Sequence, residues 1–221
     1  MAIATSVIFD LDGTLVDSRS DIIAAFSHGL GAVGLSDEAV AAFQPQIRQL
    51  IGSPLREMYE QALVGGDDAQ VEAACEAYRA HYFEHCTDRT RPFPGVVECL
   101  ERLDGIPLAV ATTKKTFMAV KLLTDLGLDD RFALIQGTDD IPPKPDPTLL
   151  LKVIETLGLD RSGAWMVGDT VHDIEAANRA EIRSCAVTTG ATPKATLSHA
   201  KPTLIVDNLL DLSRFLLETS G

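Results

Sequence analysis

The segment Val7-Ile8-Phe9-Asp10-Leu11-Asp12-Gly13-Thr14-Leu15-Val16-Asp17-Ser18 opens with a short apolar run that ends at a carboxylate. The run is too short for a helix and is typical of a buried β-strand. Side chains two residues apart on a strand point to the same side, so we expect Asp10 and Asp12 to lie together. Neighbouring carboxylates repel each other and lose hydration on burial, which indicates a bound cation or a retained proton.

The pair Asp12-Gly13 is also a strong signal for the turn of a β-hairpin. A hairpin needs a second strand directly afterwards. Residues 17–33 instead begin with capping residues and continue with the apolar spacing of a helix. We therefore favour a nucleophile beside a general acid at a metal site.

Composition restricts the possible partners. The chain has 221 residues, of which 46% are hydrophobic, enough for one large domain or two small ones. No apolar run approaches the roughly 18 residues of a membrane span, and no basic segment precedes the first apolar run, so we expect neither a membrane helix nor a signal peptide. The net charge of −13 argues against nucleic acids and anionic membranes, because both are polyanions.

The four cysteines, Cys75, Cys86, Cys99 and Cys185, show neither C-x-x-C nor any other metal-ligand spacing. We expect reduced thiols in a cytoplasmic protein. The sequence does not distinguish a monomer from a homodimer.

Two textures divide the chain. Residues 17–86 have helical patterns, with helices expected near 17–33, 37–50, 54–64 and 68–86. From Arg91 onward helices alternate with strands, which are expected near 107–111, 132–136, 164–167, 182–187 and 203–206. This alternation predicts an α/β fold with a doubly wound parallel sheet and helices on both faces. Residues 1–16 and 89–221 would form this core domain, and residues 17–88 would form an inserted all-helical cap domain.

Polar residues follow several of these strands, where open parallel sheets bind ligands. They are Asp10 and Asp12, then Thr112, Thr113 and Lys114, then Lys144, and finally Asp169 and Asp173. Taken singly, the threonines could cap a helix, Lys144 could be a surface residue, and Asp169 could belong to a turn and an N-cap. Their common place at one sheet edge favours a phosphate site.

These motifs resemble those of the haloacid dehalogenase-like (HAD) hydrolase superfamily, in particular its phosphoglycolate phosphatase-like branch with a helical cap. The resemblance covers essentially the whole chain and rests on the segments 10–18, 111–114, 144–147 and 168–173. It implies a Rossmann-like core and a Mg²⁺-dependent phosphatase that acts on a small phosphorylated metabolite similar to phosphoglycolate. Two positions depart from the family pattern, since Thr113 replaces a common Asn and Glu181 a common Gly.

The resemblance also implies a role for each site residue. Asp10 would attack phosphorus and form an aspartyl-phosphate, and Asp12 would act as general acid and base. Thr112, Thr113 and Lys144 would bind the phosphoryl group, with Lys144 neutralising charge on it and on Asp10. The Mg²⁺ ion would be held by Asp10, the backbone carbonyl of Asp12 and Asp169, with Asp173 as a direct or water-mediated partner.

Alternative functions use the same residues. A mutase of the β-phosphoglucomutase type would return the phosphoryl group to a sugar, and a non-catalytic protein would only bind phosphate. Dehalogenases and phosphonatase-like members of the superfamily lack an acid at the position of Asp12, so this residue argues against both. A signalling receiver also gathers acids, Thr and Lys around a phosphorylated Asp, but it has no inserted cap.

Other residues suggest weaker hypotheses. The segment His81-Tyr82-Phe83-Glu84-His85 matches the H-x-x-E-H zinc pattern, but it has no obvious third ligand, and a packed or solvent-facing helix accounts for it better. Arg48 and Arg56 in the predicted cap, and His172 between the two late acids, could contact a substrate. Each is also typical of a solvated helix residue.

Overall fold

A computed structural model describes residues 5–218. The chain divides into two compact units, an α/β unit of Met1–Asp17 with Pro92–Gly221 and a helical unit of Ser18–Arg91. The sequence patterns predict an inserted segment at residues 17–88. Residues 1–4 and 219–221, which belong to the predicted core domain, lie outside the described residues.

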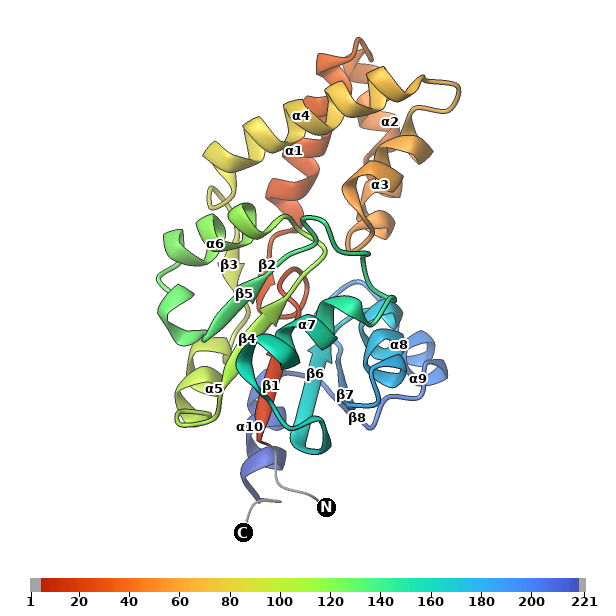
Figure 1. The fold of residues 1–221 in the computed structure, drawn as a ribbon. Helices are drawn as coiled ribbons and strands as arrows, with labels where there is room; N and C mark the ends of the chain where they lie inside the picture. The colour runs from red at the N-terminus through yellow and green to blue at the C-terminus, as the bar shows by residue number, and fades with distance from the viewer. Residues whose placement is uncertain (1–4, 219–221) are drawn as a thin grey trace. The chain divides into compact units, whose positions relative to one another are not determined.

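One six-stranded parallel sheet forms the centre of the α/β unit (Figure 1). Its strands lie in the order β5-β4-β1-β6-β7-β8, and the paired neighbours are parallel. The central strands are almost entirely apolar because helices cover both faces of the sheet. The strands are β1 (Ser6–Phe9), β4 (Leu108–Ala111), β5 (Leu134–Gln136), β6 (Ala164–Gly168), β7 (Arg183–Val187) and β8 (Leu204–Val206). The predicted α/β fold with a doubly wound parallel sheet is confirmed.

The strand order changes direction at β1. From β1 the chain moves outward through β4 and β5, and then crosses to the other side of β1 to form β6, β7 and β8. Loops that leave β4 and β6 therefore diverge on the two sides of β1. In open α/β sheets this is the position where ligands bind, and here the residues that follow β1 occupy it.

Helices lie on both faces of the sheet. On one face α7 (Thr148–Leu157) and α8 (Val171–Arg179) pack over Ile8, Ala109 and Met166. On the other face α5 (Val96–Arg102) contacts α10 (Leu209–Glu218). The ring of Phe215 meets that of Trp165 edge-on, with centroids 6.0 Å apart. The remaining helices are α6 (Thr116–Asp125), α9 (Lys194–His199) and two 3-10 turns at Asp129–Arg131 and Arg161–Gly163. The six-residue α9 was not predicted, because so short a helix has no readable period.

The helical unit consists of α1 (Arg19–Ala32), α2 (Asp37–Leu50), α3 (Leu55–Ala62) and α4 (Asp68–His85). Tyr59 of α3 stacks on Phe26 of α1 with ring centroids 4.0 Å apart, and its hydroxyl donates to the Phe26 carbonyl at 3.1 Å. Two short strands that were not predicted, β2 (Val16–Asp17) and β3 (Arg91–Pro92), pair where the chain passes between the units.

Asp21 ties the two ends of the helical unit together. It lies in the first turn of α1 and is buried. Its Oδ2 accepts hydrogen bonds from the backbone N–H groups of Arg89 and Thr90 at 3.0 and 2.7 Å, and from the Thr90 hydroxyl at 2.7 Å. One carboxylate oxygen therefore satisfies three donors that come from the segment after α4.

The end of α8 contains a backbone conformation that favours glycine. Helix α8 ends at Arg179, and Glu181 two residues later has a φ of 57°. A side chain in this left-handed region costs about 1–2 kcal/mol relative to the ordinary conformations. Glu181 is the residue that replaces the family's common Gly, and the departure therefore places strain at this helix end.

We predict that Asp21→Ala lowers the free energy of unfolding by about 2–3 kcal/mol, because it leaves buried donors without their acceptor. Urea unfolding followed by circular dichroism measures this. Glu84→Ala, on the exposed surface of α4, is the control and should change stability by less than about 0.5 kcal/mol. Equal effects of the two substitutions would contradict the role of Asp21.

We predict that Glu181→Gly raises the free energy of unfolding by about 1 kcal/mol, because glycine adopts a positive φ without strain. The same substitution at exposed Glu155, within α7, should lower it by about 1 kcal/mol, since glycine weakens a helix interior. Thermal unfolding of both variants compares the two signs. A destabilised Glu181→Gly protein would show that the left-handed residue is not strained.

Candidate active site

The chain bends sharply after β1 and places two carboxylates at the sheet edge. The Asp10 N–H donates to the Val167 carbonyl at 2.8 Å, which extends the pairing of β1 with β6. Gly13 then turns the chain with a φ of 88°, and its N–H donates to the Val16 carbonyl at 2.9 Å. A Cβ on Gly13 would come within 2.4 Å of the Asp169 carboxylate, so both the turn and the space require glycine.

Three acids from three segments meet at this edge. Asp10, Asp169 and Asp173 are buried, and each offers a carboxylate oxygen within 4.8 Å of the others. Among residues 5–218 they are the only group of three or more acids, histidines or cysteines close enough to hold a metal ion. The structure thus brings together three of the predicted metal ligands. Asp12, whose predicted ligand is a backbone carbonyl, lies two residues after Asp10.

Neighbouring hydroxyls fix two of these acids. The Thr14 hydroxyl donates to Asp169 Oδ1 at 3.0 Å. Thr170 is the N-cap of α8, and its N–H and hydroxyl donate to Asp173 Oδ2 at 3.0 and 2.6 Å. This reciprocal capping box holds Asp173 at the third position of the helix. Its other oxygen, Oδ1, points to the amine of Lys144.

Lys144 is the cation of the cluster. It is buried, and its Nζ donates to Asp10 Oδ1 at 2.7 Å, to Asp173 Oδ1 at 2.5 Å and to the Ala111 carbonyl at 2.9 Å. A buried ammonium loses hydration, and these three acceptors replace it. The same contacts join the end of β4 to the carboxylates that follow β1 and β6.

The three carboxylates of the cluster carry more negative charge than the single ammonium of Lys144 can neutralise. Burial raises the pKa of Asp10 to about 7, with Asp173 adding to the shift and Lys144 opposing it. Burial, Asp10 and Asp173 likewise raise the pKa of Asp169. Burial acts to lower the pKa of Lys144, but Asp10 and Asp173 outweigh it, so its pKa lies above the ordinary value. Lys144 alone does not balance the three acids, and a cation at their oxygens would.

The two threonines after β4 lie against the loop that follows β5. Thr112 is buried, its N–H donates to the Gln136 carbonyl at 3.1 Å, and its hydroxyl accepts from the Lys114 N–H at 3.3 Å. The Thr113 carbonyl accepts from the Thr138 hydroxyl at 2.6 Å. Thr112 directly follows Ala111, whose carbonyl binds Lys144, so its place at the cluster edge comes from the backbone.

Several residues of the site received no role in the sequence analysis. Lys114 Nζ lies 3.2 Å from Asp12 Oδ2, and Thr14 binds Asp169. After β7, the Thr189 hydroxyl donates to the Gly13 carbonyl at 2.6 Å, and a Cβ on Gly190 would come within 1.7 Å of Asp169. The strand-end rule that selected the other residues also points to this Thr-Gly pair, because it follows a strand of the same sheet.

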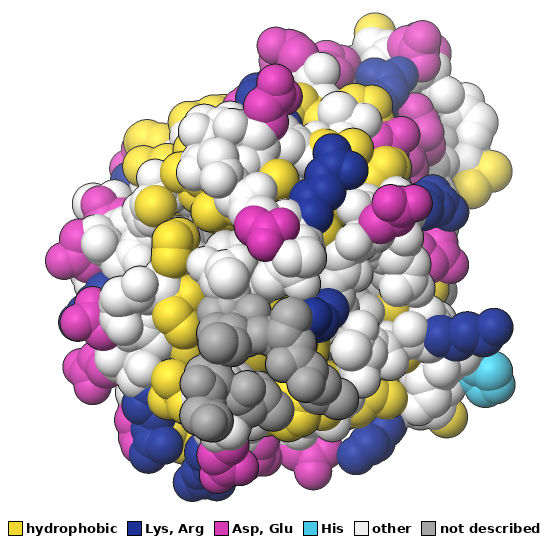
Figure 2. Space-filling view, turned by 60° about the horizontal axis from the view of Figure 1, so that its bottom comes forward, with side chains coloured by type: hydrophobic (Ala, Val, Ile, Leu, Met, Phe, Trp, Pro, Cys, Tyr) yellow, Lys and Arg dark blue, Asp and Glu magenta, His cyan; other side chains and the backbone are white. Residues whose placement is uncertain are grey.

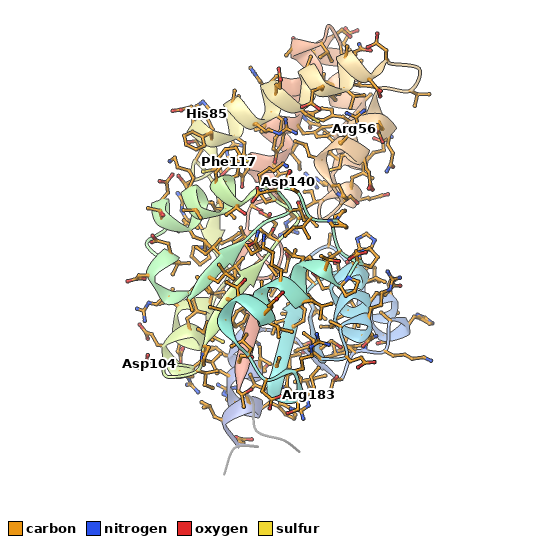
Figure 3. The ribbon with its side chains drawn as sticks, viewed as in Figure 1. Arg56, His85, Asp104, Phe117, Asp140 and Arg183 are labelled. Atoms are coloured by element: carbon orange, nitrogen blue, oxygen red, sulfur yellow. The ribbon has the colours of Figure 1, made fainter. Side chains whose placement is uncertain are left out.

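Within the helical unit, Arg56 is engaged by other side chains. It lies on α3 (Figure 3) and pairs with Glu60 at 2.9 Å, with Asp68 at 2.7 Å and with Glu72 at 3.5 Å. Arg48 is exposed in the last turn of α2. The His81 ring stands between those of His28 and His85, with centroids 4.6 and 4.5 Å away, and these histidines are not among the described groups that could hold a metal. His172, partly exposed, lies in the first turn of α8 beside Asp173.

The charge of the surface, the length of the helices and the state of the cysteines can be compared with the partners and the location that the sequence predicts. On the face that Figure 2 presents, Lys and Arg side chains are scattered among Asp, Glu and hydrophobic side chains. No helix among the described residues is long and apolar enough to cross a membrane. All four cysteines are buried and carry free thiols. The cytoplasmic location stays a prediction.

Comparisons with known proteins identify the family. A model of haloacid dehalogenase-like hydrolases matches residues 7–187. A phosphoglycolate phosphatase of Agrobacterium fabrum is 35% identical over 96% of this chain and 91% of its own, and phosphoglycolate phosphatase 1 of Pseudomonas aeruginosa is 36% identical over 93% and 77%. The crystal structure of a hydrolase from Pseudomonas syringae, 30% identical, covers 98% of this chain and 100% of its own with a TM-score of 0.82.

The chain therefore belongs to the haloacid dehalogenase-like hydrolase family, in its phosphoglycolate phosphatase-like branch. It is an enzyme, a phosphatase of the phosphoric monoester hydrolase class. Both predictions made from the motifs are confirmed.

We predict that metal-free protein loses stability as the pH rises through about 7. The folded-state pKa values of Asp10 and Asp169 are raised above 3.8, so the folded state binds more protons than the unfolded state in this range, and stability falls with rising pH. Asp169→Asn removes one of these acids. In the presence of a chelator, we subtract the melting temperature of the parent protein from that of Asp169→Asn. This difference should be more positive at about pH 8 than at about pH 5. A difference that is independent of pH would contradict the burial of ionisable acids in the cluster.

Proposed function

We propose that this enzyme hydrolyses a small phosphorylated metabolite, 2-phosphoglycolate in the first place, through an aspartyl-phosphate on Asp10. The observation that carries the proposal is the buried contact of 2.7 Å between Asp10 Oδ1 and Lys144 Nζ, with Asp12 two residues further along the chain. A carboxylate held by a cation at the carboxyl end of a strand is oriented for attack on phosphorus.

In the first step a carboxylate oxygen of Asp10 forms a bond to phosphorus, and the bond between phosphorus and the leaving oxygen breaks. Asp12 gives its proton to that oxygen, which leaves as an alcohol. Lys144 neutralises charge on Asp10 and on the equatorial phosphoryl oxygens, and Thr112 donates to one of them. Thr113, next in the chain, adds its backbone N–H to this binding.

In the second step water attacks phosphorus and the Asp10–phosphorus bond breaks. Asp12, now ionised, accepts the proton of the water, so one residue serves as acid and then as base. Inorganic phosphate leaves, and both aspartates return to their starting forms. Lys144 keeps its position between Asp10 and Asp173 throughout.

The cofactor that we propose is Mg²⁺, because the acid cluster provides only oxygen donors and carries excess negative charge. Asp10, Asp169, Asp173 and the backbone carbonyl of Asp12 would hold the ion. When bound, Mg²⁺ would neutralise negative charge on Asp10 and on the dianionic phosphoryl group. This also explains how a chain with a net charge of −13 accepts an anionic substrate.

The similarity to two phosphoglycolate phosphatases supports the proposed substrate. We propose the same activity for this chain, and we propose that the helical unit acts as a cap. That unit is inserted between β2 and β3, directly after the segment that carries Asp10 and Asp12. A cap inserted there would select substrates by their leaving group. Arg56 is paired with three acids and would therefore not contribute to this selection.

We predict that the protein with Mg²⁺ releases phosphate from 2-phosphoglycolate, and that Asp10→Asn abolishes release because an amide cannot attack phosphorus. Chelation should also remove activity, and added Mg²⁺ should restore it. A phosphate assay over a panel of phosphorylated metabolites measures this, with the exposed Asp104→Asn as control.

Two results would contradict the proposal. Activity retained in Asp10→Asn would exclude an aspartyl-phosphate at this residue. Conversion of a sugar phosphate to its isomer, without release of phosphate, would establish the mutase instead.

A further inference from the structure

A second ion pair lies beside the one made by Lys144. Lys114 Nζ is 3.2 Å from Asp12 Oδ2, and the two side chains are only 7% and 11% exposed. Both sequestered charges lose hydration, so the pair forms at the cost of desolvation. A lysine sequestered in this way, beside the second carboxylate of the site, calls for a reason beyond ordinary surface charge.

The backbone on each side of this pair is fixed. The Lys114 N–H donates to the Thr112 hydroxyl at 3.3 Å, and the Lys114 carbonyl accepts from the Thr138 N–H at 3.0 Å. Across the site, Asp12 forms a bridge with Val16, and the Gly13 carbonyl is held by Thr189. With both ends of the ion pair anchored, the contact at Oδ2 restrains the orientation of the Asp12 carboxyl group.

When Asp10 and Asp12 are both ionised, the charge on Lys114 also opposes their repulsion. Asp12 and Asp10 lie two residues apart at the sheet edge, and the charge of Asp12 acts on Asp10. Lys144 contacts Asp10 and Asp173, while Lys114 contacts Asp12. One lysine therefore lies beside the proposed nucleophile, and the other lies beside the proposed general acid.

We propose that Lys114 is a positioning residue that orients the Asp12 carboxyl group for proton transfer to the leaving oxygen. This inference rests on the proposed function, in which Asp12 is the general acid. It assigns Lys114 no contact with the reacting atoms, because Lys114 acts through Asp12. Removal of the Lys114 amine should therefore slow phosphoryl transfer from those substrates whose leaving group needs a proton.

The test compares two leaving groups. The leaving group of 2-phosphoglycolate is a strongly basic alkoxide, which needs a proton. The leaving group of 4-nitrophenyl phosphate is the weakly basic 4-nitrophenolate, which leaves without one. With Mg²⁺ present, Lys114→Met should lower kcat/KM for 2-phosphoglycolate by about 10- to 100-fold and for 4-nitrophenyl phosphate by less than about 3-fold. Because kcat/KM reports the first phosphoryl transfer, the later hydrolysis of the aspartyl-phosphate does not obscure the comparison.

Three further variants complete the experiment. Lys114→Arg keeps a cation beside Asp12 and should recover most of the loss. In an Asp12→Asn background, Lys114→Met should have little additional effect, because its target is gone. Lys115→Met is the matched control, since Lys115 Nζ donates to the Asp139 carbonyl at 2.6 Å, and it should leave both substrates unaffected.

The outcomes separate the inference from the proposed function. Suppose that Asp12→Asn lowers kcat/KM for 2-phosphoglycolate far more than for 4-nitrophenyl phosphate, whereas Lys114→Met lowers the two values equally or not at all. The role of Lys114 is then overturned, and the proposed function stands. If Asp12→Asn shows no such dependence on the leaving group, the general-acid role of Asp12 is overturned, and the role of Lys114 with it. Should Lys114→Met fail to fold, Lys114→Gln, which also removes the charge, provides the same comparison.

Discussion

The site depends on the burial of one ammonium among carboxylates. Lys144 Nζ contacts Asp10, Asp173 and the Ala111 carbonyl at the end of three different strands or helices. Removing one member of such a pair leaves a charge in a poorly solvated place, which commonly costs about 3–5 kcal/mol. The arrangement is therefore an all-or-none unit, in which the cation and the acids stay buried because each has the other.

The parallel sheet makes this unit possible. Strands β4, β1 and β6 are neighbours, and they end at the same edge although residues far apart in the sequence form them. Each strand end delivers one kind of group, a carboxylate after β1, a threonine after β4 and an acid with a helix cap after β6. Rigid, fully buried strands hold these groups more precisely than surface loops could.

Much of this was predictable from the sequence for a simple physical reason. Apolar runs followed by polar residues mark strand ends, and parallel strands bring such ends together, so Asp10, Thr112, Lys144 and Asp169 could be selected before any coordinates were known. The order of the strands and the pairing of β1 with β4 and β6 required the structure. Short elements such as α9 were not predicted, since a few residues carry no period.

Partner choice was the part that the sequence could not supply. Lys114 stood in a recognised motif, but nothing in the pattern says that its amine turns to Asp12 and not to solvent. Asp21 was an unremarked helix residue, yet it accepts three hydrogen bonds from a segment 68 and 69 positions away. Such contacts depend on side-chain rotamers and on long-range packing, which local spacing does not encode.

Asp169 lies between two glycines from distant parts of the chain. Thr14 binds it across 155 positions, Gly13 and Gly190 leave it room, and Thr189 binds Gly13 across 176 positions. Contacts of this sequence separation form only when most of the chain is present. A growing chain thus carries the aspartates that follow its first strand for most of its synthesis, and the contacts around Asp169 are complete only when the residues after β7 have been added.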